Sequence, residues 1–118
     1  MQRQYRLGCN RRFQYVYRRG KRVSSPSVTL VYTGTGGRQK KFGFSVSKKV
    51  GCAVVRNRVR RRLRECVRPL LPHLGNGQFV FIARNAAANV SFDRLRNEVS
   101  GLLRRCGALK EQAHNPKP

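Results

Sequence analysis

The chain has 118 residues, 39% of them hydrophobic, which is enough for one small domain with a single modest core. Its 27 lysine and arginine residues stand against four acidic residues and give a formal net charge of +23, which favours a polyanionic partner. Because the sequence has no tryptophan and no apolar run long enough to span a membrane, we expect a soluble, cytoplasmic protein that binds nucleic acid rather than a membrane.

The chain begins with a pattern that predicts a short, basic helix. Asn10 is a suitable N-cap residue, and Gly20 would close the helix in a left-handed conformation. The helix carries Phe13, Val16 and Tyr17 on one side. These aromatic side chains can stack on unpaired bases or can anchor the helix to a core, and the residues alone leave both roles open.

Strands follow this helix. Alternating residues predict a strand over 28–33, which can begin near Val23 before Pro26 interrupts it. A glycine-rich turn at 34–37 then leads into a return strand over 40–49. Bulky residues on one face of the return strand alternate with small residues on the other, which leaves room for a ligand. The small face comprises Gly43, Ser45 and Ser47.

The segment 51–68 predicts a helix with an apolar stripe on one side and arginines on roughly the opposite side. An arginine run ordinarily forms a solvated face. Here Glu65 is the one acid in the segment, so like charges repel along the helix, and this favours a polyanionic ligand. The stripe comprises Cys52, Val55, Val59, Leu63, Cys66 and Leu70, and the basic side comprises Asn57, Arg60, Arg61, Arg64 and Arg68.

The rest of the chain predicts a buried strand and a final helix. The apolar run at 78–84 follows a glycine-rich stretch at 75–77 and is typical of a strand buried on both faces. Ser91 can cap a helix that Gly107 ends, and residues 108–118 are expected to form a frayed tail. A strand, helix, strand order across the arginine helix indicates a mixed sheet with helices packed on it.

The sequence shows no pattern of catalytic or metal-binding residues. His73 and His114 lie in a proline-rich bend and in the tail, where histidines are ordinarily solvated. The four cysteines include no C-x-x-C pair, and the acids form no cluster suited to a metal-dependent nuclease. Three of the cysteines fall on apolar helical stripes, which predicts reduced and mostly buried thiols: Cys52, Cys66 and Cys106.

One block of the sequence resembles a known family. FSVSKKVGCAVVRNRVRRRLRE at residues 44–65 is similar to the signature of the bacterial ribonuclease P protein subunit. FQYVYRRGKR at 13–22 and IAR at 82–84 extend the resemblance, which covers most of residues 5–107. Two residues depart from the family pattern: Cys52 replaces an Asn or Lys, and Arg60 takes a place commonly held by Lys.

The resemblance implies an α+β fold, namely a small α/β sandwich like the second domain of ribosomal protein S5. Its order is helix, strands, helix, strand, helix, with a left-handed βαβ crossover through the arginine helix, where general rules favour a right-handed one. Residues 1–118 would form a single ribonuclease P protein domain. Its ordered core would span about residues 5–107, and residues 108–118 would form a flexible basic tail.

The resemblance also implies a function. The protein would be the RNA-binding subunit of a ribonucleoprotein endonuclease whose catalytic RNA hydrolyses the 5′ leader from precursor tRNA. Mg2+ would be held chiefly by the RNA, with no metal, catalytic residue or obligate protein partner assigned to this chain. The arginine helix would contact the catalytic RNA, and a cleft between the first helix and the sheet would receive the leader. The catalytic-RNA contacts would be Arg56, Asn57, Arg58, Arg60, Arg61 and Arg64, and the leader contacts Phe13, Tyr17, Ser45, Ser47 and Lys48.

Two alternatives share the charge of this chain. A structural protein that binds ribosomal RNA would leave the cleavage of precursor tRNA unchanged. A DNA-binding protein would place the arginine helix in a major groove, where Asn57 and Arg61 could read bases, and would prefer duplex DNA to structured RNA.

Overall fold

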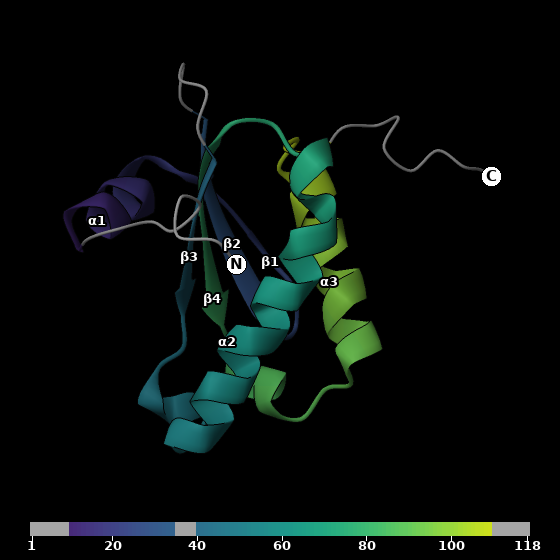
Figure 1. Ribbon diagram of the computed structural model, residues 1–118. Helices are drawn as coiled ribbons and strands as arrows, with labels where there is room; N and C mark the ends of the chain where they lie inside the picture. The colour runs from purple at the N-terminus through teal and green to yellow at the C-terminus, as the bar shows by residue number, and fades with distance from the viewer. Residues whose placement is uncertain (1–9, 35–39, 110–118) are drawn as a thin grey trace.

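A four-stranded mixed sheet with helices on both faces organises the molecule (Figure 1). The computed structural model describes residues 10–34 and 40–109, with side chains from residue 14 onward. The elements are α1 (Asn10–Arg19), β1 (Lys21–Ser24), β2 (Val28–Thr33), β3 (Lys40–Ser45), α2 (Ala53–Val67), β4 (Gly77–Ala83) and α3 (Phe92–Arg105), with short 3-10 helices η2 (Lys48–Val50), η3 (Arg68–His73) and η4 (Asn85–Ala88).

The strand order is β1-β2-β4-β3, and β4 pairs antiparallel with β2 and parallel with β3. The expected α+β class is thereby confirmed. Figure 1 shows β3 and β4 both pointing downward while α2 passes in front of the sheet from β3 to β4. This arrangement gives the crossover the left-handed sense that the resemblance implies.

The return-strand prediction was wrong about pairing. β2 and β3 follow one another in the chain but are not neighbours, because β4 lies between them. β4 occupies the centre because it is apolar on both sides: Val80 on one face and Phe81 on the other are both fully buried. A strand of this kind gains most where both of its faces are covered. The residues before Pro26 form a separate edge strand, β1.

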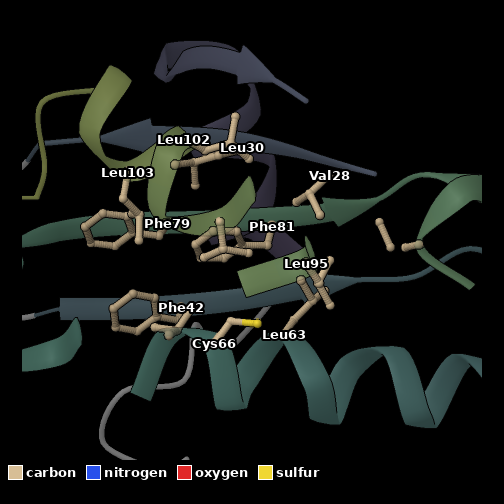
Figure 2. Close-up of a cluster of buried hydrophobic side chains, with 14 of the residues drawn as sticks. Val28, Leu30, Phe42, Leu63, Cys66, Phe79, Phe81, Leu95, Leu102 and Leu103 are labelled. Atoms are coloured by element: carbon tan, nitrogen blue, oxygen red, sulfur yellow. The ribbon is translucent and has the colours of Figure 1, made fainter. Parts of the chain in front are cut away.

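The larger core lies between the sheet and the pair α2 and α3. Figure 2 shows aromatic side chains of the sheet facing the two helices. Phe42 on β3 stacks on Phe79 on β4, with 4.8 Å between the ring centroids. Leu63 from α2 and Leu95 from α3 complete this layer, and both are fully buried. The core thus fixes α2 by its apolar stripe and leaves the opposite side of that helix outward.

A much smaller cluster holds α1 against the other face of the sheet, which we call the α1 face. It consists of Val16 from α1, Val31 from β2 and Val80 from β4. Gly20, at the end of α1, does not have the left-handed conformation that the sequence predicted. It is glycine for another reason: a Cβ there would lie 2.5 Å from the Val16 carbonyl oxygen and 2.5 Å from Val31 Cγ1.

The two ends of α3 lie where the sequence predicts them. The predicted start of the tail at residue 108, however, is too early. The Ser91 side chain accepts a hydrogen bond of 3.1 Å from the Arg94 amide, and Gly107 has a φ of 85°. Ala108 and Leu109 are buried rather than frayed, because Leu109 bridges to Leu74 in the core. Residues 110–118 lie outside the described part of the chain.

Glu98 of α3 fastens the turn between β1 and β2. Its carboxylate accepts hydrogen bonds from the Ser25 hydroxyl at 2.6 Å, the Ser27 amide at 2.8 Å and the Ser27 hydroxyl at 3.0 Å. Arg94 Nε donates a further one at 3.3 Å. Burial alone raises the pKa of Glu98, but these donors outweigh burial and lower the pKa below its ordinary value.

We expect Glu98→Gln to lower the free energy of unfolding by about 2 kcal/mol at pH 7, because a neutral amide accepts these hydrogen bonds less well. A lowered folded-state pKa stabilises the fold above the unfolded-state value and loses that contribution as the pH falls through the folded-state value. The difference from the parent protein should therefore shrink below about pH 4. Urea unfolding across a pH series measures it, and a difference independent of pH would contradict this account.

Candidate nucleic-acid interface

The outward side of α2 carries side chains that no acid within residues 10–34 and 40–109 neutralises. Arg61 and Asn57 are exposed, and Arg60 is partly exposed. Arg60 Nη1 donates a 2.7 Å hydrogen bond to Asn57 Oδ1, which orients its guanidinium along the helix surface. Glu65 does pair with an arginine, as expected, but its partner is Arg68 at 2.6 Å near the end of the helix. The centre of the surface is left purely basic.

Arg56 and Arg64 lie on the same helix, and each is four residues from Arg60, so the three arginines form one row. The Arg64 guanidinium lies over the ring of Phe44 on β3, 5.9 Å from its centroid. Arg56 Nε is buried without a hydrogen-bond partner in the described structure. Such a donor is costly to leave unpaired, so an incoming acceptor would gain from it. We call the six predicted residues the α2 surface: Arg56, Asn57, Arg58, Arg60, Arg61 and Arg64.

Two arginines of α2 also have a structural role that the sequence did not indicate. Arg58 Nη2 approaches the Ala88 carbonyl at 3.5 Å, and Arg62 Nη1 donates to the Val90 carbonyl at 3.3 Å. These acceptors lie in the segment before α3, about thirty residues away in the chain. Arg58 and Arg62 therefore tie α2 to that segment, and part of the hydrogen-bonding capacity of their guanidinium groups is used by these carbonyls.

The predicted leader contacts lie largely on the other side of the sheet. Tyr17 is partly buried and packs, like Ile82, against the small cluster under α1. Ser45 is paired in register with Ile82 and therefore projects from the α1 face beside it. The structure thus brings Tyr17 and Ser45 to one surface. The side chain of Phe13 lies outside the described residues, so its position is not assigned.

Ser47 and Lys48 lie between the two surfaces. Both are exposed, Ser47 directly before η2 and Lys48 within it, on the path from β3 to α2. They follow the edge strand of the sheet, so a polyanion that passes from the α1 face to the α2 surface at this edge meets them. The predicted residues therefore form two surfaces joined at the β3 edge.

The α1 face has further polar and aromatic groups that the sequence did not single out. Tyr15 on α1 is 45% exposed, the larger of the two aromatic exposures described on that helix. Thr33 and Gln78 are paired in register, and Thr33 Oγ1 and Gln78 Oε1 are buried without partners in the described structure. The alternation of aromatics at 13, 15 and 17 was the one available signal for Tyr15.

Cys52 was predicted to lie on the apolar stripe, and the structure corrects this. It precedes the first turn of α2, is exposed, and lies where the helical period no longer applies. The backbone amides of Val55 and Val54 in the first turn of the helix, with the nearby Arg56 charge, favour the thiolate and lower the pKa of this thiol. Cys66 and Cys106 are buried as expected, and burial raises the pKa of Cys66 to about 11.

We expect iodoacetamide at neutral pH to alkylate Cys52 far faster than Cys66 or Cys106 in the folded protein. The reactive species is the thiolate, and its fraction is raised at Cys52 and suppressed at the two buried thiols. Timed quenching followed by peptide mass mapping gives the three rates. Comparable rates at Cys52 and Cys66 would show that this local arrangement is wrong, and unfolding in guanidinium should equalise them.

Comparison with known proteins decides which family this geometry belongs to. The family model described as Ribonuclease P matches residues 1–107. The chain belongs to the ribonuclease P protein family. It is 41% identical over 114 residues to the ribonuclease P protein component of Symbiobacterium thermophilum, covering 95% of this chain and 99% of that one. It is also 41% identical to the Roseiflexus castenholzii component, covering 93% and 92%.

Solved structures of ribonuclease P proteins share the fold. The Staphylococcus aureus protein at 2.0 Å superposes with a TM-score of 0.84 at 27% identity and covers 90% of this chain and 98% of that one. The Thermotoga maritima protein superposes with a TM-score of 0.77 at 27% identity, covering 85% and 96%. Family membership makes this chain a protein component of a ribonucleoprotein endoribonuclease that associates with ribonuclease P RNA. The ribosomal and DNA-binding alternatives have no comparable support.

Within residues 10–34 and 40–109, no three side chains of His, Cys, Asp or Glu come together as metal ligands would. No helix in the same ranges is long and apolar enough to cross a bilayer.

Proposed function

We propose that this protein assists the catalytic RNA of ribonuclease P in removing the 5′ leader from precursor tRNA in the cytoplasm. It does so in two ways: the α2 surface binds and stabilises the catalytic RNA, and the α1 face with the β3 edge holds the single-stranded leader. The RNA carries out the hydrolysis. The observation that supports this division is the placement of the two sets of predicted residues on opposite sides of one sheet, joined by Ser47 and Lys48.

The α2 surface acts through charge. Catalytic RNAs bring phosphates close together, and arginines that neutralise them lower the concentration of magnesium that the RNA requires. In this proposal the magnesium ions belong to the RNA, and the chain supplies fixed guanidinium groups instead. Asn57, which holds Arg60 at 2.7 Å, limits the loss of side-chain freedom when that arginine meets a phosphate.

The α1 face acts through stacking and hydrogen bonds. A leader nucleotide that lies against α1 meets aromatic side chains, and stacking of a base on such a ring is worth about 1–3 kcal/mol. Ser45 offers a hydroxyl donor to the backbone at the same place. Single strands are recognised by such contacts without a strong sequence preference, which suits a subunit that serves many precursors.

The decisive experiment compares 5′ cleavage of a precursor tRNA by the catalytic RNA at low magnesium with and without this protein. The proposal expects cleavage at the mature 5′ end only, faster with the protein, and an advantage that shrinks as magnesium is raised. An equal rate with and without the protein, under conditions where the complex forms, would refute the assisting role.

Tyr17→Leu should weaken the binding of precursors with long leaders by roughly fivefold or more, since stacking of one base is worth about 1–3 kcal/mol. Leucine keeps an apolar side chain against the small cluster and removes the aromatic face together with the phenol hydroxyl. The measurement is the dissociation constant of the holoenzyme for precursors with long leaders and with leaders of one nucleotide. The short-leader substrate is the control, and an equal loss for both would contradict a leader contact.

A further inference from the structure

A second group of cations lies at the β1 edge of the sheet, which is the edge opposite to β3. They come from three elements: the end of α1, the edge strand β1 and the end of α3. All five side chains are exposed. We call this group the β1-edge surface, and it comprises Arg18, Arg19, Lys21, Arg22 and Arg105.

Several contacts bring these three elements together. Gly20 joins α1 to β1 without an intervening loop and packs on β2 at Val31. Arg105 Nη1 donates a 3.0 Å hydrogen bond to the Ser24 carbonyl, the last residue of β1. The charge of Lys21 is close enough to lower the pKa of Cys106, although burial dominates and the net shift is upward. The end of α3 therefore lies along β1.

No described acid offsets this surface. In the described part of the chain, the three carboxylates are each committed elsewhere: Glu65 to Arg68 in α2, Asp93 to Arg96 and Glu98 to Arg94 in the first half of α3. Like charges on adjoining elements repel one another in the free protein, so an anion that neutralises them stabilises the grouping.

The β1-edge surface and the α2 surface have no element in common. β1 and β3 are the two edges of the sheet, with β2 and β4 between them. Three strand spacings of about 4.8 Å separate these edges by about 14 Å. α2 follows the β3 edge in the chain, whereas the β1-edge surface is built on the opposite edge. Each surface can therefore take its own stretch of polyanion.

We propose that the β1-edge surface is a second RNA-binding site, which takes the sugar-phosphate backbone of a structured RNA segment distinct from the one on α2. The inference rests on the proposed function and extends it: the protein bridges two RNA segments across the width of its sheet. Lys21 projects to the α2 and α3 side of the sheet and Arg22 to the α1 face, because their register partners are Tyr32 and Val31. The site therefore wraps around the edge and fits a backbone rather than a base.

The test uses the reconstituted holoenzyme and the variant Lys21→Gln/Arg22→Gln, which leaves the Arg105 contact to Ser24 in place. Loss of two phosphate contacts should weaken binding by about tenfold or more and reduce the salt slope by roughly 1.4–1.8. The swap Lys21→Arg/Arg22→Lys keeps the charges and should bind normally. Arg68→Gln/Arg96→Gln removes the same charge from cations already paired with acids and should have little effect.

Two measurements identify the source of the backbone. Weaker assembly with the catalytic RNA assigns the site to that RNA, whereas normal assembly with weaker binding of precursor tRNA with a one-nucleotide leader assigns it to the tRNA body. If the variant changes neither the assembly with the catalytic RNA nor the binding of precursor tRNA, and its thermal midpoint equals that of the parent protein, the inference is wrong. The variant Arg60→Gln/Arg61→Gln in the same assays distinguishes a failure of this inference from a failure of the proposed function. If this variant also leaves RNA binding unchanged, the proposed function itself is wrong.

Discussion

Arg60→Gln/Arg61→Gln is expected to weaken binding of the catalytic RNA by about 30-fold at physiological salt, since two phosphate contacts are lost. The slope of log affinity against log salt should become shallower by roughly 1.4–1.8, depending on whether the contacted RNA is single-stranded or duplex. Glutamine has a helix propensity close to that of arginine, and the two side chains point away from the core, so the fold should be unaffected. Filter binding over a salt series measures both quantities.

The chain provides a matched control for this variant. Arg68→Gln/Arg96→Gln also lowers the net charge by two, but each arginine is already paired with an acid, at 2.6 Å and 3.0 Å. If affinity depended only on the total charge of the protein, both variants would weaken binding equally. Equal losses would therefore show that the α2 surface has no special role, and a steep loss confined to the first variant supports it.

Gly20→Ala should destabilise the protein by roughly 2–3 kcal/mol and loosen α1 from the sheet. The new Cβ would lie 2.5 Å from both the Val16 carbonyl oxygen and Val31 Cγ1, and the first is backbone that cannot move without the helix. Because the described side chains of α1 pack on a small cluster, α1 should detach before the larger core unfolds. Hydrogen exchange of the α1 amides and precursor binding with long leaders report this directly.

Gly101→Ala is the matching substitution with the opposite expected sign. Gly101 lies within α3, and a Cβ there would meet nothing within 4 Å. Alanine in a helix interior is favoured over glycine by about 0.5–1 kcal/mol, so the variant should be more stable than the parent. If both substitutions changed stability in the same direction, the crowding at Gly20 would not be the cause.

Local patterns predicted the helices well because their determinants are close together in the chain. The apolar stripe of α2 is buried at Val59, Leu63 and Cys66, and α3 begins after the predicted cap at Ser91. The stripe failed only at Cys52, which precedes the helix. Periodicity says which side of a helix is buried but not at which residue the helix starts.

Features that depend on distant residues were not predictable in the same way. The insertion of β4 between β2 and β3 is set by which strand gains most from burial on both faces, and no turn or spacing encodes it. The partners of Arg58 and Arg62 lie about thirty residues away, so a run of arginines could not show which were tied down. For Gly20, the residue type was informative but the reason for it lay across the sheet.

The central place of β4 has a consequence for synthesis of the protein. In the described structure β3 pairs with no other strand, so the sheet cannot close until residues 77–83 have been made. The whole arginine helix is therefore synthesised before the strand that completes the sheet. Closure is a late and cooperative event that depends on contacts between distant parts of the chain. A polypeptide that stops short of residue 77 would contain every arginine of α2 and still lack the platform that presents them.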